Sequence, residues 1–200
     1  MTQPDLAPAA DRLAGLVQGV DDDQLGGTTP CPDYTLGDLL DHVGGFAMAF
    51  AAAARKETLP DSAAGPSADA TRLEEGWRER ITTDLRTLAA AWDEPDAWTG
   101  MTAAGGLELP GEVAGLVALD ELVLHGWDVA RASGQAFDVD QPALEAVHGF
   151  VSQFSGPGQE DSRAGLFGPV VPVSDDAPLL DRVVGLAGRD PAWSPRSTTD

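Results

Sequence analysis

The sequence has 200 residues, which is enough for one domain with a sizeable hydrophobic core and does not require two. Its 33 acidic residues against 12 lysines and arginines give a formal net charge of −21. Such a surface repels phosphate backbones and anionic lipid head groups, so we expect neither a nucleic-acid partner nor a membrane partner.

Cysteine content and hydropathy narrow the class further. The single cysteine, Cys31, excludes an intramolecular disulfide and a four-cysteine zinc site. The N-terminus lacks the basic segment and apolar run of a secretory signal. The longest clean apolar run, 46–54, is far shorter than the roughly 20 residues that a membrane-spanning helix needs. We therefore expect an acidic cytoplasmic protein in which residues 1–200 form a single domain.

The first two predicted helices are amphipathic. Residues 5–19 carry an apolar stripe at helical spacing, and a second helix is expected from Thr35 to about residue 56. Thr35 and Asp38 have the spacing of a capping box, which favours a helix start at this point. The stretch 58–70 is rich in proline, serine, alanine and glycine, and predicts a loop inside the domain.

The middle of the chain predicts a third helix and a turn. Residues 71–92 have helical periodicity, and Gly105-Gly106 suggests a short hairpin. The core face of this helix is expected to carry Leu73, Trp77, Ile81, Leu85 and Leu88.

The remaining predicted helices have recognisable ends. Residues 111–133 form a fourth helix that stops at Gly134, and a fifth begins at Pro142. A short helix is expected from Pro178. The sum is a mostly all-α fold, built as a bundle of about four long helices with short extra helices and a small hairpin.

The fourth predicted helix carries the chemistry. Apolar residues cover more than half of its circumference, which predicts burial on most sides. Glu121, His125 and Asp128 nonetheless lie at positions i, i+4 and i+7 and form one narrow polar line. Burying a carboxylate or an imidazole is costly unless the group is paired or bound to a cation. A metal ion is the most economical shared partner, because a glutamate and a histidine one turn apart can converge on one ion.

His42 favours a metal site over a simple hydrogen bond. Glu–His pairs at this spacing also arise by chance, but His42 lies at the margin of the second helix's apolar stripe, where facing helices meet. It would supply a third ligand beside Glu121 and His125, leaving coordination positions open as in catalytic sites. We expect Zn²⁺. Two histidines and one carboxylate also hold iron in non-haem oxygenases, although there the ligands usually come from β-strand barrels.

Two nearby residues have open interpretations. Asp128 would either accept a hydrogen bond from His125, act as a catalytic base, or form a salt bridge with Arg131. Cys31 is either a reactive thiol near the site or a small buried residue. His148 has no acidic or histidine neighbour one turn away, and is expected at the surface or the edge of the core.

Two motifs together resemble a known family. The pairing of TPCPDYTLGDLLDHV with DELVLHGWDVARASGQ is similar to the DinB-like, mycothiol-dependent maleylpyruvate isomerase metal-binding superfamily, and most of all to its single-domain metal-binding branch. The C-terminal LFGPVVPVSDDAPLLDRVVGLAGRDPAW is also similar, so the resemblance covers nearly the whole chain. It implies a DinB-like four-helix bundle with a divalent metal on His42, Glu121 and His125, and with Asp128 near a thiol site.

The resemblance also implies a type of function. The family's metal activates a low-molecular-weight thiol such as mycothiol, which then attacks a small electrophile. Because the chain is short, we expect it to lack the separate C-terminal domain of the isomerase and therefore not to isomerise maleylpyruvate. A metal-dependent thiol S-transferase or detoxification enzyme is the first interpretation. The alternative is a non-catalytic metal-binding protein whose ion stabilises the bundle or is sensed. Both a monomer and a homodimer are compatible with the sequence.

Overall fold

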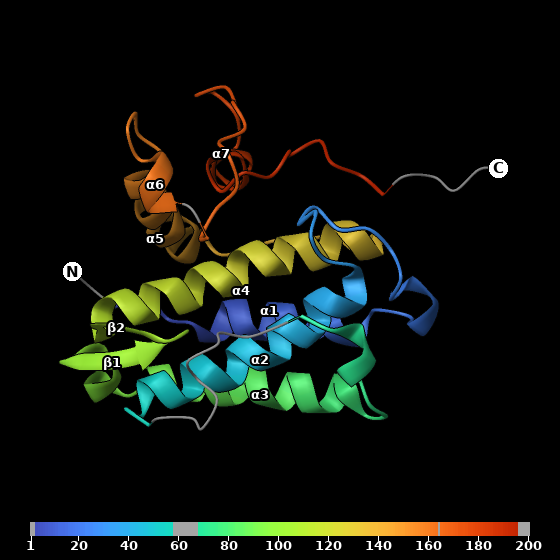
Figure 1. The fold of residues 1–200 in the computed structure, drawn as a ribbon, viewed down its shortest axis with the longest axis horizontal. Coiled ribbons are helices and arrows are strands. Elements are labelled where there is room, and N and C mark those ends of the chain that lie inside the picture. The colour runs from blue at the N-terminus through green and yellow to red at the C-terminus, as the bar shows by residue number, and fades with distance from the viewer. Residues whose placement is uncertain (1–2, 58–67, 164, 196–200) are drawn as a thin grey trace.

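Four long helices form the body of the molecule. The computed structural model describes residues 3–57, 68–163 and 165–195. The bundle helices are α1 (Ala7–Gln18), α2 (Leu36–Ala54), α3 (Trp77–Trp92) and α4 (Gly111–Ser133). Helix α2 packs against α3 and α4, and α1 packs against the same two helices from the other side (Figure 1). The predicted bundle of four long helices is confirmed.

The start of α2, which carries His42, is fixed by local hydrogen bonds. The Asp38 backbone N–H donates to Thr35 Oγ1 at 3.2 Å, and Thr35 N–H donates to Asp38 Oδ2 at 3.1 Å, so the predicted capping box is confirmed. Asp38 Oδ1 also accepts from the Ala70 backbone N–H at 2.8 Å. The turn at Ala70 is thereby tied to the first turn of α2, about one helical turn before His42.

Helix α3 begins later than predicted. The prediction of one continuous helix over 71–92 is wrong, because the segment first makes a single turn at Ala70–Arg72 and α3 starts only at Trp77. Gly76 separates the two with a φ of +81°, in the left-handed region that a right-handed helix cannot include. From residue 77 onward the predicted core face of α3 is confirmed. Its apolar residues are buried: Trp77, Ile81, Leu85 and Leu88. Leu73 lies before the helix and is partly buried.

A hairpin leads into α4. Strands β1 (Met101–Ala104) and β2 (Leu107–Pro110) pair antiparallel around Gly105-Gly106, as predicted. Both glycines have positive φ, +56° and +79°, which suits a two-residue hairpin turn. Helix α4 then runs to Ser133 and ends at Gly134, whose φ is +73°. The predicted C-terminal glycine is confirmed.

A smaller helical unit covers the opposite side of α4. It contains α5 (Gln141–Val151), α6 (Glu160–Arg163) and α7 (Leu179–Leu186). In Figure 1 these three helices lie on one side of α4 and α1–α3 lie on the other, so α4 is enclosed along much of its length. The connection between α4 and α5 also packs closely on α4, since a Cβ atom at Gly126 would come within 2.9 Å of the Phe137 ring. Single turns at Asp22–Gln24, Pro95–Trp98 and Ser152–Phe154 complete the helical segments of the described chain.

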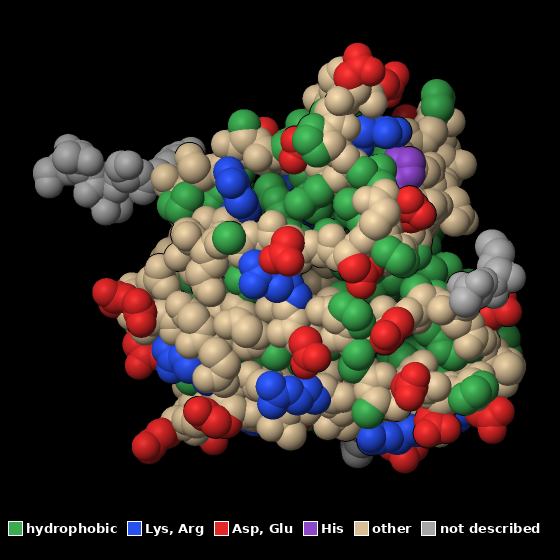
Figure 2. Space-filling view, turned by 180° about the vertical axis from the view of Figure 1, so that it is seen from behind, with side chains coloured by type: hydrophobic (Ala, Val, Ile, Leu, Met, Phe, Trp, Pro, Cys, Tyr) green, Lys and Arg blue, Asp and Glu red, His purple; other side chains and the backbone are tan. Residues whose placement is uncertain are grey.

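The surface agrees with the acidic composition. On the face shown in Figure 2, lysine and arginine side chains are scattered singly among acidic ones and do not gather into a basic patch. None of the helices in the described parts of the chain is long and apolar enough to cross a membrane. The expectations of a cytoplasmic location and of no nucleic-acid partner stay predictions.

Candidate metal centre

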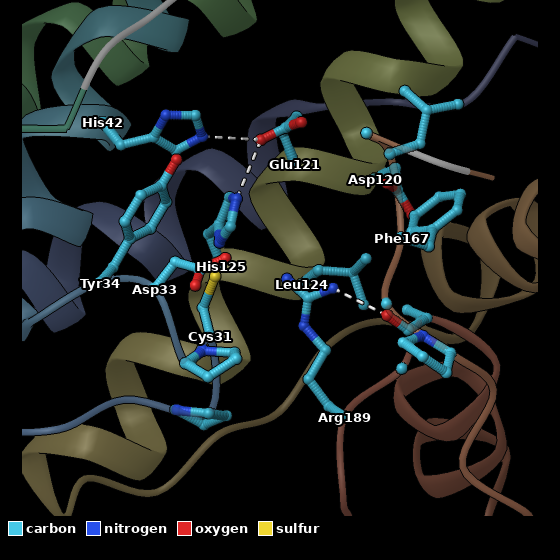
Figure 3. Close-up of a pocket in the computed structure, with 18 residues that line it drawn as sticks. Cys31, Asp33, Tyr34, His42, Asp120, Glu121, Leu124, His125, Phe167 and Arg189 are labelled. Atoms are coloured by element: carbon cyan, nitrogen blue, oxygen red, sulfur yellow. Dashed lines mark hydrogen bonds and ion pairs between the residues drawn. The ribbon is translucent and has the colours of Figure 1, made fainter.

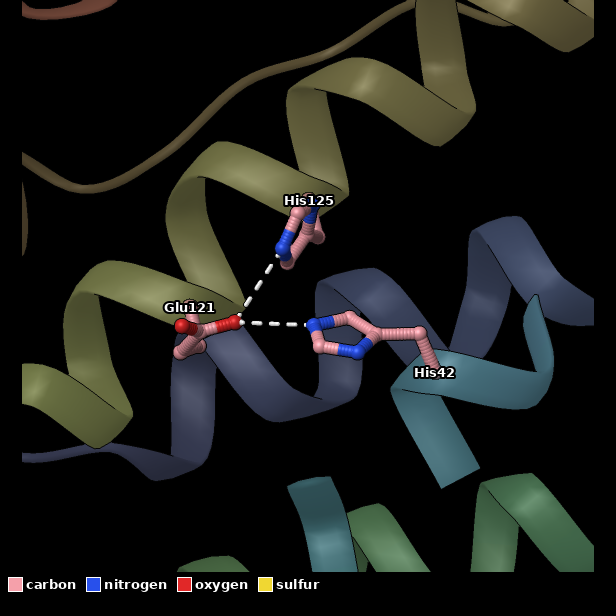
Figure 4. Close-up of side chains that lie close together, drawn as sticks. All are labelled: His42, Glu121 and His125. Atoms are coloured by element: carbon pink, nitrogen blue, oxygen red, sulfur yellow. Dashed lines mark hydrogen bonds and ion pairs between the residues drawn. The ribbon is translucent and has the colours of Figure 1, made fainter. Parts of the chain in front are cut away.

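His42, Glu121 and His125 meet between α2 and α4. Glu121 Oε2 lies 3.4 Å from His42 Nε2 and 3.1 Å from His125 Nε2 (Figure 4). The two imidazole rings stand nearly perpendicular, with centroids 4.9 Å apart. Among the described residues, one potential ligand atom from each of the three side chains lies within 4.8 Å of the other two. Three residues separated by up to 83 positions therefore converge on one point.

The spacing of these atoms fits a divalent ion. Zinc bonds of about 2.0–2.1 Å in a tetrahedral site place neighbouring ligand atoms about 3.3–3.4 Å apart. The observed 3.1 and 3.4 Å are close to that value. Imidazole nitrogen and carboxylate oxygen are also ligands that zinc accepts. Both the geometry and the donor set are thus suited to a three-ligand site with at least one open position.

A buried chain of charges stands behind His125. Its Nδ1 lies 3.0 Å from Asp128 Oδ2, and Asp128 in turn accepts a hydrogen bond from Arg189 Nη2 at 2.9 Å. Asp128 is completely buried. Burial alone would raise its pKa, but the Arg189 charge and the His125 hydrogen bond lower it below its usual value. Asp128 is held as a carboxylate that orients His125 with Nε2 toward Glu121.

Neighbouring groups shift the pKa values of Glu121 and His125, the two ligands on α4. Burial disfavours the charged form of His125, but its bonds to Asp128 and Glu121 raise its pKa to about 9. Burial also opposes ionisation of Glu121, yet the hydrogen bonds to His125 and His42 hold its pKa well below the usual range. A cation bound between these ligands would stabilise the Glu121 carboxylate, as the protonated His125 imidazole does in the metal-free protein.

His42 is held differently. Its Nδ1 is buried and has no hydrogen-bond partner in the described part of the chain. Its ring instead packs against Tyr34, with centroids 5.5 Å apart, and against the edge of Phe46 at 5.7 Å. Both rings face Glu121 through Nε2, but the Nδ1 side of His42 is held by ring packing and that of His125 by a hydrogen bond.

The three ligands open into a pocket of about 500 Å³. Its walls come from the loop 30–34, from α4, and from two stretches of the C-terminal unit, 165–169 and 187–189 (Figure 3). The 30–34 loop is pinned by Thr29, whose hydroxyl group bonds to the Cys31 and Tyr34 carbonyl oxygens at 2.7 and 3.0 Å. A pocket of this size accepts a small organic molecule beside the ligands.

The far wall is held in place by a buried arginine. Arg163 donates to the carbonyl oxygens of Phe154 at 2.9 Å, Gly168 at 2.9 Å and Leu186 at 2.8 Å. It is only 7% exposed, and among the described residues it makes no ion pair. Its guanidinium group joins the helical turn that ends at Phe154, the loop at Gly168 and the end of α7, and so fixes the stretch at 165–169 that lines the pocket.

Cys31 lies in the pocket wall but is not an activated thiol. Its side chain is half-buried, and burial together with the nearby Asp128 charge raises the pKa of the thiol to about 11. The thiol form is therefore dominant at neutral pH, and a nucleophilic role is disfavoured. His148, the third histidine, is half-buried on α5 and does not line the pocket, as the sequence suggested.

One sequence-based pairing is wrong and two pocket residues were missed. Asp128 does not form the salt bridge with Arg131. Arg131 donates to the Trp193 carbonyl oxygen, and Asp128 forms its salt bridge with Arg189. Arg189 lies 61 positions from Asp128 and has no periodic relation to it, so no local pattern could reveal the pair. Asp120 also lines the pocket and is only 4% exposed. Its apolar neighbours at i+3 and i+4, Val123 and Leu124, were the available signal.

The fold and the site together define a class. A helical bundle in which two histidines and one glutamate from two adjacent helices converge, beneath a pocket closed by a C-terminal unit, is a DinB-like candidate metal protein. Residues 6–130 match the family described as Mycothiol maleylpyruvate isomerase N-terminal domain, and the chain belongs to that family.

Relatives and solved structures support this assignment over the length of the chain. Two uncharacterised proteins of Mycobacterium tuberculosis, MT0763 and Rv0738, are each 31% identical over 189 residues, which is 90% of this chain and 93% of theirs. The crystal structure of the mycothiol-dependent maleylpyruvate isomerase aligns with a TM-score of 0.66 at 18% identity, and that of a point mutant with 0.61 at 19%. The fold predicted from the resemblance is confirmed.

The extent of the structural match corrects one expectation. The alignment to the isomerase covers 98% of this chain and 91% of the isomerase chain, and to the mutant 92% and 86%. The expectation that this chain is too short to include a counterpart of the isomerase's C-terminal part is therefore wrong. In this chain the segment after α4 contains α5–α7, and its residues 165–169 and 187–189 line the pocket. That residues 1–200 form one domain stays a prediction.

Proposed function

We propose that the protein is a metal-dependent enzyme that binds a low-molecular-weight thiol of the mycothiol type and transfers it to a small electrophile. Its family and fold support a mycothiol-related role. The observation that carries the proposal is the convergence of His42, Glu121 and His125 at the floor of an open pocket. An ion on these ligands, Zn²⁺ in our proposal, would supply a Lewis acid that favours the thiolate form of a coordinated thiol.

The surrounding residues have distinct roles in this proposal. Asp128 holds the His125 ring through Nδ1 and is separated from the pocket by full burial, so we assign it as a positioning residue and not as the base that the sequence suggested. Arg189 neutralises Asp128 and forms part of the pocket wall. Tyr34 and Leu124 narrow the pocket beside the ligands and exclude water from one side of a bound thiol.

Thiol-dependent turnover tests this proposal. Zinc-loaded protein is mixed with mycothiol and either a chlorinated nitroarene or a bromobimane, and formation of the thioether is followed by absorbance or fluorescence. We expect turnover that depends on both thiol and protein and that is lost in His42→Ala. The matched control is His148→Ala, which removes a histidine outside the pocket and should keep full activity.

A second candidate function rests on the position of the ligands. His42 comes from α2 and the other two from α4, so a bound ion would also cross-link two helices of the bundle. An ion with only this stabilising role would raise the melting temperature without any turnover. Zinc-loaded protein that consumes no electrophile with any thiol would favour this second function and contradict the first.

A further inference from the structure

Asp120 is a buried acidic side chain that the metal site does not use. It is 4% exposed, and its Oδ1 is buried with no hydrogen-bond partner among the described residues. It directly precedes Glu121 on α4, so its side chain leaves the helix about 100° away from the ligand. Figure 3 shows it on the side of the pocket where Phe167 of the C-terminal unit lies.

An unpaired buried acceptor needs an explanation. Leaving such an oxygen without a hydrogen bond costs about 1–3 kcal/mol, and more for a charged group. The other buried acid of α4, Asp128, is fully paired with His125 and Arg189. Asp120 has no such partner in the described chain, yet it lines a pocket that can hold a small molecule. A ligand is the partner that the geometry leaves available.

We propose that Asp120 is the recognition point of a second subsite, which accepts a hydrogen bond from a hydroxyl or amide group on the thiol bound at the metal site. This inference rests on the proposed function, since the metal ligands hold the sulfur end of the same molecule. Two apolar side chains also line the pocket on this side, Leu124 one turn along α4 and Phe167 of the C-terminal unit. One polar group placed in an apolar wall is an effective selector, because a molecule without the matching donor leaves the acceptor unpaired.

A neutral donor fits this subsite better than an ammonium group. The Arg189 guanidinium lines the same pocket and acts electrostatically on Asp120, while the Glu121 and Asp128 carboxylates act in the opposite sense. A divalent ion on Glu121 would offset the charge of that carboxylate. An additional cationic group on the ligand would then meet the positive charges of the ion and Arg189, whereas a hydroxyl or amide group carries no net charge. The preferred thiol therefore carries hydroxyl or amide groups several bonds away from its sulfur.

Calorimetric titration of zinc-loaded protein with two thiols tests the subsite. Mycothiol carries hydroxyl and amide groups, and 1-propanethiol carries neither. We expect wild-type protein to bind mycothiol more tightly than propanethiol. Asp120→Leu should weaken mycothiol binding about tenfold or more and leave propanethiol binding and zinc content unchanged. Asp120→Asn keeps an acceptor oxygen, and should retain most of the mycothiol affinity.

Control measurements separate recognition from structure. Asp84 on α3 is the control, since its Oδ2 is also buried without a hydrogen bond but lies outside the pocket, with Arg80 Nη1 3.7 Å away. Asp84→Leu should leave both thiol affinities unchanged. Asp120→Leu should raise the melting temperature, because a buried polar group without a hydrogen bond is replaced by an apolar group of similar size. A lower melting temperature with loss of zinc would show a structural role and overturn the inference.

The titrations of wild-type protein also test the subsite and the proposed function separately. Equal affinity of wild-type protein for both thiols would overturn the subsite while leaving the proposed function intact. Equal weakening of both thiols in Asp120→Leu would do the same. If zinc-loaded wild-type protein binds neither thiol, the proposed function and the subsite both fail.

Discussion

The two histidines of the candidate metal centre are supported in different ways. His125 on α4 has a buried chain behind it, in which Asp128 bonds to its Nδ1 and Arg189 bonds to Asp128. His42 on α2 has a buried Nδ1 without a partner in the described chain, and is held by contact with the rings of Tyr34 and Phe46. One ligand is thus oriented by charge and hydrogen bonds, and the other by shape.

This difference predicts how each half of the site responds to change. Removing a charge behind His125 affects the orientation, the basicity and the burial energy of the ligand at once. Removing a ring beside His42 only loosens its packing. The α4 half should therefore be sensitive to charge and pH, and the α2 half to the loss of side-chain volume.

The largest effect is expected from Asp128→Asn. The variant weakens the acceptor for His125 and leaves the buried Arg189 without a compensating charge. We expect zinc affinity to fall about 10–100-fold, because partners of ligand histidines contribute that much. The metal-free protein should lose about 3–5 kcal/mol in its free energy of unfolding, as when one partner of a buried ion pair is removed. Competitive zinc titration and urea unfolding measure the two quantities.

A double variant separates these two consequences. Asp128→Leu combined with Arg189→Met removes the whole ion pair, and should recover most of the lost stability. Zinc affinity should stay low, because His125 still lacks its acceptor. Recovery of zinc affinity together with stability would contradict a positioning role for Asp128.

A change of pH is expected to have an intermediate effect on the stability of the metal-free protein. The pKa of His125 is about 9 in the folded metal-free protein, above its ordinary value of 6.5. A raised folded pKa contributes stability that is fully present below pH 6.5 and is lost as the pH rises through about 9. We therefore expect the melting temperature of metal-free wild-type protein to exceed that of His125→Gln most at pH 6, and the difference to shrink toward pH 9.5.

Zinc loading provides the control for this pH series. A bound ion takes the place of the proton on His125, so the stabilisation should no longer decline over the same interval. A melting-temperature difference between metal-free wild type and His125→Gln that stays constant from pH 6 to 9.5 would show that the carboxylates around His125 do not hold its proton.

The smallest effects are expected on the His42 side. Tyr34→Phe keeps the ring beside His42, and should leave zinc affinity unchanged within about twofold. Tyr34→Ala removes the ring, and should lower zinc affinity by up to about tenfold. Zinc titrations of the two variants, made beside Asp128→Asn, give the ranking directly. A larger loss in Tyr34→Phe than in Asp128→Asn would reverse the comparison between the two halves.

The sequence predicted the parts of this molecule that depend on local periodicity. The bundle helices, the Thr35 cap and the turn at Gly105-Gly106 each follow from residues close together in the chain. The exception was the start of α3, where a single positive-φ glycine, Gly76, interrupts a pattern that is otherwise continuous. The spacing of Glu121 and His125 on one helix face was predictable for the same reason.

The parts that were missed depend on long-range packing. Arg189 reaches Asp128 only because the segment after α7 lies against α4. Arg163 fixes the pocket wall through carbonyl groups that carry no sequence signal. Asp120 was overlooked because Glu121 beside it already explained an acid at that point of the helix. The meeting of His42 with Glu121 was expected from the arrangement of a bundle and from family resemblance, not from spacing.

The metal content of the protein tests the central claim most directly. Protein purified without added metal, and then dialysed against zinc, is analysed by elemental mass spectrometry beside His42→Ala and His148→Ala. The account predicts one divalent ion per chain in wild type and His148→Ala, and none in His42→Ala. A wild-type protein that binds no divalent ion, or a His42→Ala variant that binds as much as wild type, would contradict it.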